Sequence, residues 1–176
     1  MARLRLPIRN VLSMASSKTP TDLKNRAKQI IARAAQTGLT LATAESCTAG
    51  ALATLLANAP GAGETFHGGF VVYTKLNKTR ALGVDASLIA EYSAVSPEVA
   101  KAMARGALKR SPADLAVSIT GVAGPEPDED GNPVGLVHIA VAGPGGLLLH
   151  EEHRLSQAVA LILPSWKSKI INRHTS

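Results

Sequence analysis

The amino-acid sequence predicts a three-layer α/β/α sandwich with a mixed, mostly parallel sheet. Two observations predict this fold. Helical and strand-like segments alternate along the chain until a final hairpin, and the composition is 45% hydrophobic but only 3% aromatic. Ala, Val, Leu and Ile must therefore build the core, which suits packed helices and a sheet better than an aromatic-rich β-barrel. We expect a leader at 1–19, one domain at 20–163 and a divergent tail at 164–176.

The first half of the domain predicts two helices and two strands. Residues 20–37 have helical spacing of apolar residues, and Gly38 ends that helix. The apolar run at 39–44 predicts a strand, and a helix follows from about 47 to 59. The stretch GGFVVYT, residues 68–74, predicts the second strand.

The second half predicts three helices and three strands. Ser96–Pro97–Glu98 is a strong helix start, because it offers a cap, a proline in the first turn and an acid near the positive end of the helix dipole. Two apolar runs flank a Pro–Gly–Gly turn and predict a hairpin. The expected elements are helices at 75–82, 86–92 and 96–109, a strand at 115–120, hairpin strands at 136–143 and 147–155, and a last apolar stretch at 158–163.

The charge distribution argues against a nucleic-acid-binding protein. The net charge is +6, but Arg3, Arg5, Arg9 and Lys18 lie in the acid-free leader, and removing those four leaves +2. A folded nucleic-acid binder usually carries a basic stripe, often with aromatics. The leader has the composition of an organellar transit peptide, but a disordered leader, or a start at Met14, is the interpretation we favour.

The cysteine content favours a reducing compartment. Cys47 is the single cysteine, so no internal disulfide can form. No apolar run approaches the roughly 20 residues of a membrane span. We expect a cytoplasmic protein without a membrane partner, and organellar targeting by the leader is the alternative.

The stretch TAESCTAG, residues 43–50, places Ser46 where a strand is expected to end and a helix to begin. A serine there can be a simple helix cap. Small neighbours, among them Ala44 and Ala49, leave room for a ligand, and the following N–H groups can form an oxyanion hole. Ser46 is therefore a candidate nucleophile.

A serine nucleophile needs a base, and the histidines are poor candidates. His138 falls in the middle of an apolar strand and is expected to pack, and His67 is expected in a loop. Lysine can act as the base if burial or a nearby charge lowers its pKa. Lys75 and Lys78 both follow the second strand, and the sequence alone leaves both open. The remaining histidines, in the hairpin or tail, are His150, His153 and His174.

Two further features flank this candidate site. Gly121 and Gly124, in SITGVAGP, let backbone N–H groups approach an anion or a carbonyl, although a plain connecting loop is an equal alternative. The acids of the following loop are expected to form a solvated turn rather than a metal site. Cys47 is expected to pack, because neighbouring Glu45 raises a thiol pKa.

The motifs TAESCTAG, GGFVVYTKLNK, LGV, AVS, SITGVAGP and NPVGLVHIAV appear in one order. In that order they resemble the CinA C-terminal domain family of nicotinamide-nucleotide amidohydrolases, or nicotinamide mononucleotide (NMN) deamidases. The resemblance covers about residues 39–142. It implies hydrolysis of the NMN carboxamide to nicotinate mononucleotide and ammonia, with an α/β sandwich that commonly dimerises. The chain resembles the stand-alone form, without the molybdopterin-binding-like domain of many members.

The resemblance also implies the site residues. Ser46 matches the family's nucleophile, and Tyr73 and Lys78 match its tyrosine and lysine, which selects Lys78 over Lys75. We expect no metal and no cofactor. Substrate contacts are expected from Glu45, Cys47, Thr48, Thr120, Gly121, Ala123, Gly124 and Arg154.

The C-terminus departs from the family pattern. A final helix with arginines is usual there, but Arg154 is the only basic residue near the expected place and Pro164 interrupts the segment. Three interpretations stay open: an NMN amidohydrolase, a nucleotide-binding paralogue with impaired catalysis, or a serine amidase or esterase of other specificity.

Overall fold

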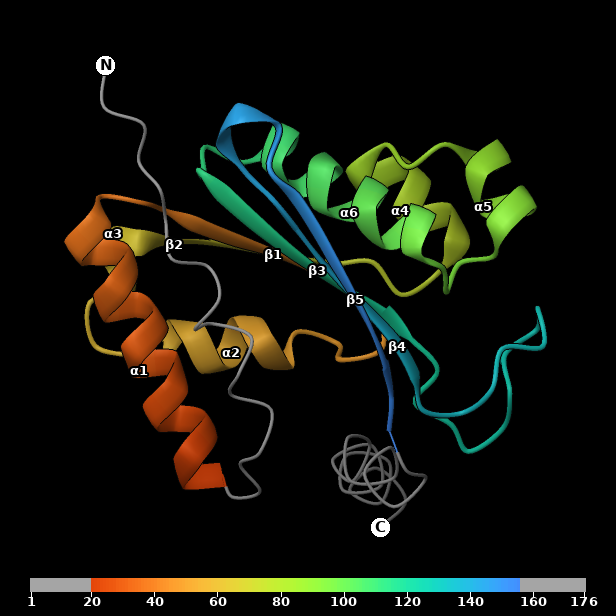
Figure 1. Ribbon diagram of the computed structural model, residues 1–176, viewed down its shortest axis with the longest axis horizontal. Coiled ribbons are helices and arrows are strands. Elements are labelled where there is room, and N and C mark those ends of the chain that lie inside the picture. Colours follow the sequence, from red (N-terminus) through yellow and green to blue (C-terminus); the bar gives the residue numbers. More distant parts are fainter. Residues whose placement is uncertain (1–19, 156–176) are drawn as a thin grey trace, which may run out of the picture.

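The computed structural model describes residues 20–155, and Figure 1 shows how they fold. Helices and strands alternate up to a closing hairpin, whose strands are joined by a 3-10 turn at Pro144–Gly146. The elements are α1 (Pro20–Thr37), β1 (Leu41–Glu45), α2 (Ala51–Ala57), α3 (Ala62–Thr65), β2 (Phe66–Val71), α4 (Lys75–Leu82), α5 (Ala86–Tyr92), α6 (Pro97–Arg110), β3 (Leu115–Gly121), β4 (Leu136–Ala142) and β5 (Leu148–Arg154).

The five strands form one mixed sheet in the order β2-β1-β3-β4-β5. β1 pairs in parallel with β2 on one side and with β3 on the other. β4 is antiparallel to both β3 and β5, so it is the only one of the five that runs in the reverse direction. The predicted fold class is confirmed, and the parallel part brings the carboxyl ends of β1, β2 and β3 to one edge of the sheet.

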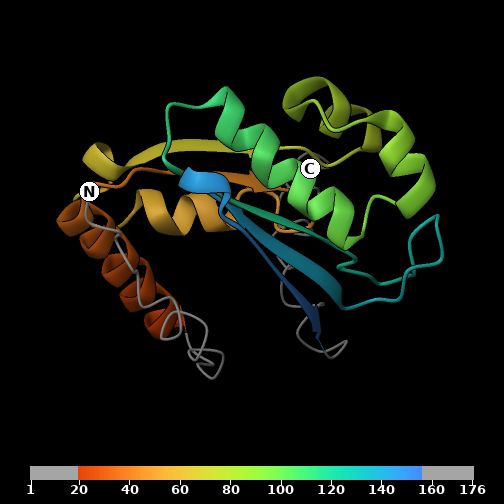
Figure 2. The same ribbon diagram turned by 45° about the horizontal axis from the view of Figure 1, so that its top comes forward.

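Helices cover the sheet in two layers, as Figures 1 and 2 show. On one face, Val99 and Met103 of α6 pack against Ala44 and Ala116 of the central strands, with α4 and α5 closing the cluster. On the other face, α1, α2 and α3 form a second cluster around buried Ile31. Aliphatic side chains build both cores, as the composition predicts.

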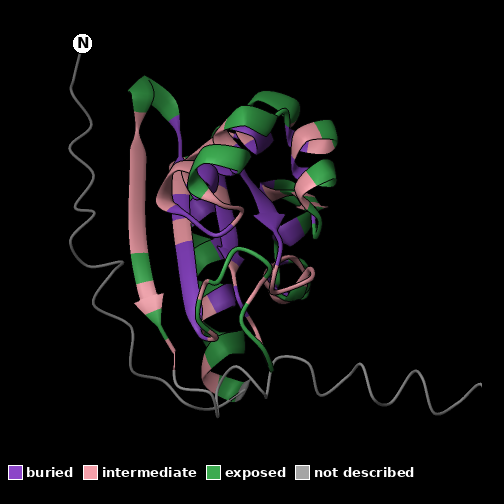
Figure 3. Cartoon of the chain, turned by 90° about the vertical axis from the view of Figure 1, so that its right-hand side faces the viewer, coloured by how far each residue is buried: buried purple, intermediate pink, exposed green. Residues whose placement is uncertain are grey.

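Burial decreases toward the edge of the sheet (Figure 3). β1 is buried along its whole length, whereas β5 is half-buried or exposed. His138, on β4, is buried and its Nδ1 lies 3.0 Å from His150 Nε2 on β5. The prediction that His138 packs is therefore confirmed.

Most predicted elements match within a few residues at each end, and the main differences concern α2, α3 and β2. α2 begins at Ala51 rather than near residue 47, and the short helix α3 was not predicted. β2 begins at Phe66, so His67 lies in a strand and the prediction of a loop is wrong. The pairing of β1 with β2 shifts register next to Gly68, whose φ is 122°. This irregularity is a β-bulge, and glycine is common in bulges because it tolerates such a φ.

Some expectations fall outside the described part of the chain. The leader at 1–19, the apolar stretch at 158–163, the tail at 164–176 and His174 are among them. Among the helices within residues 20–155, none combines the length and apolar character needed to cross a membrane.

Candidate active site

The site begins where β1 ends. Ser46 directly follows β1 and its backbone N–H donates to Ile119 O of β3, 2.9 Å away. Lys78 lies in the first turns of α4, which follows β2. Because β1 and β2 are parallel neighbours, the two side chains meet at the same edge of the sheet. Both are buried: Ser46 is 6% exposed and Lys78 is 2% exposed.

Lys78 Nζ lies 2.8 Å from Ser46 Oγ. It also donates to two backbone carbonyls, those of Val72 at 3.1 Å and Tyr73 at 3.4 Å. A neutral amine has two N–H donors and one lone pair. When the carbonyls accept the two N–H groups, the lone pair remains for the Ser46 hydroxyl, which is the geometry a general base requires.

The pKa of Lys78 is lowered to about 8, chiefly by burial; Cys47 opposes this shift, and the positive charge of nearby Lys75 makes a smaller contribution in the lowering direction. No carboxylate is among the groups that change this pKa. Such a lysine is neutral in a large fraction of molecules slightly above neutral pH. It can therefore accept a proton, as an ordinary surface lysine cannot.

The turn after Ser46 explains why α2 starts late. Ala49 (φ 51°) and Gly50 (φ 92°) both have left-handed backbone conformations, so residues 46–50 form a turn and not the first turn of a helix. The expectation that Ser46 sits at a helix N-terminus is wrong. Ser46 is therefore not a helix cap, and its hydroxyl is available to Lys78.

Glu45 caps α2 instead. Its fully buried carboxylate accepts from the N–H groups of Gly50 (3.1 Å), Leu52 (3.0 Å) and Ala53 (2.7 Å). An acid is well placed there, because the first N–H groups of a helix have no partner within the helix and carry partial positive charge. The structure thus assigns Glu45 to the support of the turn and not to the lining of the cavity.

Replacing Glu45 with Ala is expected to destabilise the fold by about 3 kcal/mol, because buried N–H groups lose their acceptor. Urea unfolding followed by circular dichroism measures this change. The matched control is Glu64→Ala, an exposed acid in the first turn of α3, which should change stability by less than about 0.5 kcal/mol. Equal stability of the two variants would contradict the capping role.

The backbone N–H groups of Cys47 and Thr48, which also interact with the Cys47 sulfur, are the candidate donors to an oxyanion in this turn. The N–H groups of Ser46 and Ala49 are used within the protein, the latter by Ser46 O at 3.0 Å. Within residues 20–155, the N–H groups of Cys47 and Thr48 donate to no backbone carbonyl. They directly follow Ser46, where donors to a developing oxyanion are needed.

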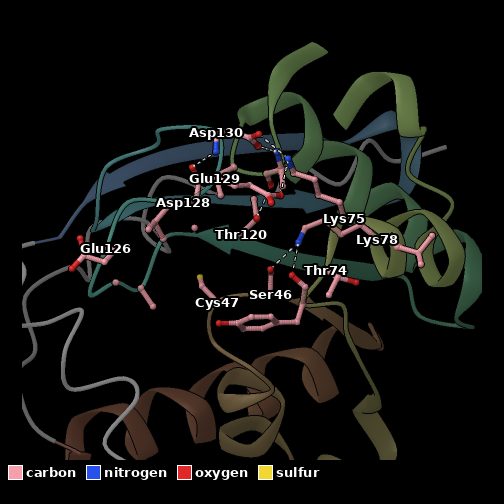
Figure 4. Close-up of a pocket in the computed structure, with 18 residues that line it drawn as sticks. Ser46, Cys47, Thr74, Lys75, Lys78, Thr120, Glu126, Asp128, Glu129 and Asp130 are labelled. Atoms are coloured by element: carbon pink, nitrogen blue, oxygen red, sulfur yellow. Dashed lines mark hydrogen bonds and ion pairs between the residues drawn. The ribbon is translucent and has the colours of Figure 1, made fainter. Parts of the chain in front are cut away.

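A cavity of about 570 Å³ opens above the pair, and Figure 4 shows its lining. One wall is formed by the pair itself with Tyr73 and Thr74. The opposite side is formed by residues 120–124, at the end of β3 and just after it, and by the acidic loop, which contains Glu126, Asp128, Glu129 and Asp130. Of the residues predicted to contact substrate, those that line the cavity are Cys47, Thr120, Gly121, Ala123 and Gly124.

The predicted glycines have different roles in the fold. A Cβ on Gly121 would lie 2.6 Å from Leu136 O, so this glycine permits the close approach of β3 and β4. Gly124 has a φ of 87°, which favours glycine. Both still line the cavity, where their backbone can face a ligand.

The thiol of Cys47 is protonated at neutral pH. Burial raises its pKa to about 11, and the charge of Glu45 contributes to the rise. The predicted effect of Glu45 on this thiol is therefore confirmed in direction. A thiol with such a pKa is a poor nucleophile beside Ser46.

Lys75, the other candidate base, has a different role. Its Nζ pairs with Glu129 at 2.8 Å and with Asp130 at 2.7 Å, as the dashed lines in Figure 4 show. These hydrogen bonds raise the pKa of Lys75, so it stays charged. It ties α4 to the acidic loop, a contact between residues 55 apart that no local pattern reveals.

Besides Glu45, two predicted contacts do not reach the cavity. Arg154 lies at the end of β5, is exposed and pairs with Glu152 at 2.9 Å. β5 is the far edge strand of the sheet, separated from β1 by two strands, which is why Arg154 is remote from Ser46. The side chain of Thr48 also lies outside the lining, and among residues 20–155 its buried Oγ1 has no hydrogen-bond partner.

Thr74 is a residue that sequence reasoning missed. Its hydroxyl caps α4 by accepting from Asn77 N–H at 3.1 Å, and it also lines the cavity. A threonine three residues before the N–H that it caps is a recognisable helix start, so the pattern was available in the sequence.

The fold and the site define an α/β sandwich protein with a buried serine–lysine pair at the carboxyl edge of its parallel strands. Residues 23–163 match the sequence profile of the CinA C-terminal domain, which is most of the chain. The chain belongs to the CinA C-terminal domain family.

Known relatives agree with this assignment. The chain is 48% identical over 139 residues to a CinA-like protein of Mycolicibacterium gilvum, covering 79% of this chain and 31% of that protein. It superimposes on the competence/damage inducible protein CihA of Agrobacterium tumefaciens with a TM-score of 0.75 and 37% identity, over 87% of this chain and 98% of that one. It superimposes on a CinA superfamily protein of Escherichia coli with a TM-score of 0.78 and 34% identity, over 90% of this chain and 93% of that one. The chain spans about a quarter to a third of the length of the curated relatives it matches.

Proposed function

We propose that this chain is an amidohydrolase that converts nicotinamide mononucleotide into nicotinate mononucleotide and ammonia. The observation that carries the proposal is the 2.8 Å contact between Ser46 Oγ and the buried Nζ of Lys78, whose pKa is lowered to about 8. The choice of substrate is supported by the ordered motifs that resemble nicotinamide-nucleotide amidohydrolases and by membership of the CinA C-terminal domain family.

In the first half-reaction, neutral Lys78 accepts the hydroxyl proton while Ser46 Oγ attacks the carboxamide carbon. The carbonyl oxygen becomes an oxyanion that the N–H groups of Cys47 and Thr48 stabilise. Lys78 then gives the proton to the amide nitrogen, the C–N bond breaks, and ammonia leaves. A nicotinoyl ester on Ser46 remains.

In the second half-reaction, a water molecule attacks the ester carbon and Lys78 accepts its proton. The bond between the carbon and Ser46 Oγ breaks, and the proton returns to Ser46. The product acid leaves and loses its remaining proton to the solvent, which gives the carboxylate. The Tyr73 carbonyl contributes by holding Lys78, together with the Val72 carbonyl. Burial of the pair keeps the lysine neutral enough to repeat the cycle.

A substrate panel tests this proposal. Ammonia release is measured from nicotinamide mononucleotide, free nicotinamide and a simple aliphatic amide, with ester cleavage followed on p-nitrophenyl acetate. We expect release from the nucleotide to exceed the other rates by at least about 100-fold in kcat/KM, because remote contacts to ribose and phosphate contribute to the transition state.

Other outcomes of the panel identify the alternatives. Comparable turnover of the simple amide or ester would indicate a serine amidase or esterase of other specificity. Binding of the nucleotide without turnover, seen as a rise in melting temperature, would indicate a paralogue that binds nucleotide without hydrolysing it.

A further inference from the structure

The segment between β3 and β4 is mostly exposed, yet its acidic loop forms one side of the cavity. Its base is closed by two backbone hydrogen bonds, from Val122 N–H to Leu136 O at 2.9 Å and from Gly135 N–H to Val122 O at 2.8 Å. Beyond this base, residues 126–132 are exposed or half-buried and project past the end of the sheet (Figure 2). Such an exposed segment keeps one position only when contacts at its tip hold it.

Asp130 holds the acidic loop from two sides. On one side, Lys75 Nζ of α4 pairs with Asp130 at 2.7 Å and with Glu129 at 2.8 Å (Figure 4). On the other side, Ala94 N–H donates to the Asp130 carboxylate at 3.5 Å, and the Ser93 side chain also forms a hydrogen bond with it. The hydrogen bonds of this carboxylate, above all that from Lys75, lower the pKa of Asp130 and keep it charged.

Ser93 has a backbone conformation that is unusual for serine. Its φ is 74° and its ψ is 157°, a region that is occupied almost only by glycine. In this conformation Ser93 Oγ accepts from Asn132 Nδ2 of the loop at 2.7 Å and from Val95 N–H at 3.1 Å. A strained residue persists only where its surroundings hold it, and here its side chain joins the turn before α6 to the acidic loop.

These contacts lie at the cavity. Lys75, Ala94, Val95 and Asp130 line it together with the serine–lysine pair. Contacts that fix Asp130 therefore also fix the position of the acidic loop relative to α4 and to the turn before α6. If the loop moved away, the cavity would widen and a ligand would lose its contacts on that side.

We propose that Ser93 and Asp130 are positioning residues, whose contact clamps the acidic loop over the cavity and thereby sets the affinity for substrate. Neither residue takes part in the bond-breaking steps. The effect on substrate affinity rests on the proposed function, whereas the clamp is a property of the free protein and can be measured without substrate.

Hydrogen exchange of the free, full chain tests the clamp. Exchange is followed by mass spectrometry on the peptide that contains residues 126–135, in Ser93→Gly, in Asp130→Ala and in the double variant. Each single variant should exchange this peptide at least about fivefold faster than the parent, because fewer contacts oppose opening of the loop. The double variant should exchange less than about twofold faster than either single variant, because both substitutions remove the same clamp.

Ser93→Gly separates the clamp from a general loss of stability. Glycine adopts the conformation of Ser93 without strain, which offsets the lost hydrogen bonds, so the melting temperature should change by less than about 2 °C. The matched control is Ser87→Gly, at an exposed position of α5 outside the cavity lining. There glycine replaces a helical residue, so the melting temperature should fall at least as much while exchange of the loop stays unchanged.

Ammonia release from nicotinamide mononucleotide tests the effect on affinity. Ser93→Gly and Asp130→Ala should each raise KM about fivefold, with kcat within about twofold of the parent, because the serine–lysine pair is unchanged. Ser87→Gly should change neither constant. In Ser93→Gly, the rise of activity near pH 8 should stay in place, since Ser93 is not among the groups that change the pKa of Lys78.

Three results would overturn the inference. Unchanged exchange of residues 126–135 in both single variants would show that the clamp does not hold the loop. Multiplied effects in the double variant would show that Ser93 and Asp130 act separately. Faster exchange with an unchanged KM would show that the loop does not set the affinity. A parent that releases no ammonia would overturn the proposed function alone, and the exchange comparison would still support or overturn the clamp.

Discussion

Replacing Ser46 with Ala is expected to lower ammonia release from nicotinamide mononucleotide at least about 10⁴-fold, because the nucleophile is lost and no neighbour replaces it. Cys47 cannot take over, since burial raises the pKa of its thiol to about 11. The backbone N–H of Ser46 keeps its bond to Ile119 O, so the variant should unfold within about 1 kcal/mol of the parent. A coupled assay for ammonia measures the rate.

The matched control is Ser111→Ala. Ser111 follows α6, and its hydroxyl bonds to Ala107 O away from the cavity. Its removal should leave the rate unchanged. Residual activity of Ser46→Ala within about 100-fold of the parent would contradict the covalent mechanism and indicate direct attack of water on the carboxamide carbon.

Replacing Lys78 with Met is expected to lower kcat/KM about 10²-fold to 10⁴-fold, the usual contribution of a general base. In the parent, activity should rise as the pH increases through about 8 and then level off, because the active form is neutral Lys78 and burial lowers its pKa to that value. The Met variant should lose this rise. The pH profile of kcat/KM between pH 6 and 10 measures both effects.

Two lysine variants serve as comparisons. Lys109→Met, at the exposed end of α6, should leave the profile unchanged. Lys75→Met should move the rise to higher pH, because the positive charge of Lys75 contributes to lowering the pKa of Lys78. A parent profile that is flat from pH 6 to 10 would contradict the assignment of Lys78 as the base.

The titration of Lys78 should also make the stability of the fold depend on pH. The pKa of Lys78 is lower in the folded protein than in the unfolded chain, so the folded state binds fewer protons between these two values. The free energy of unfolding of the parent therefore rises with pH between about 8 and 10, and this contribution is lost as the pH falls below that range. The Met variant lacks this contribution and should be at least as stable as the parent at pH 7.

Local sequence patterns were sufficient to predict most of the helices and strands of the fold. The cap at Ser96, with Pro97 behind it, predicted α6, and the structure shows Ser96 Oγ accepting from Val99 N–H at 3.2 Å. The start of α2 could not be predicted in this way. It depends on a non-glycine residue, Ala49, adopting a left-handed conformation and on Glu45 reaching forward to cap the helix.

The candidate site was predictable in its outline. A serine after one strand and a lysine after the next are brought together when the strands are parallel neighbours, and the structure has that pairing. The sequence pattern alone did not show whether Lys75 or Lys78 is the base. That choice depends on the ion pairs of Lys75 with the acidic loop, which join distant parts of the chain. Arg154 was misplaced because the order of the strands in the sheet, unlike their order in the chain, cannot be read from spacing.

The serine–lysine pair is a local unit of the chain. Ser46 and Lys78 are 32 residues apart, and the carbonyls that hold the lysine lie between them. The facing wall of the cavity comes from a separate region, residues 120–130. The ion pairs of Lys75 with Glu129 and Asp130 join the two regions. Substitutions elsewhere in residues 120–130 can therefore change which molecule the cavity accepts while the serine–lysine pair is kept.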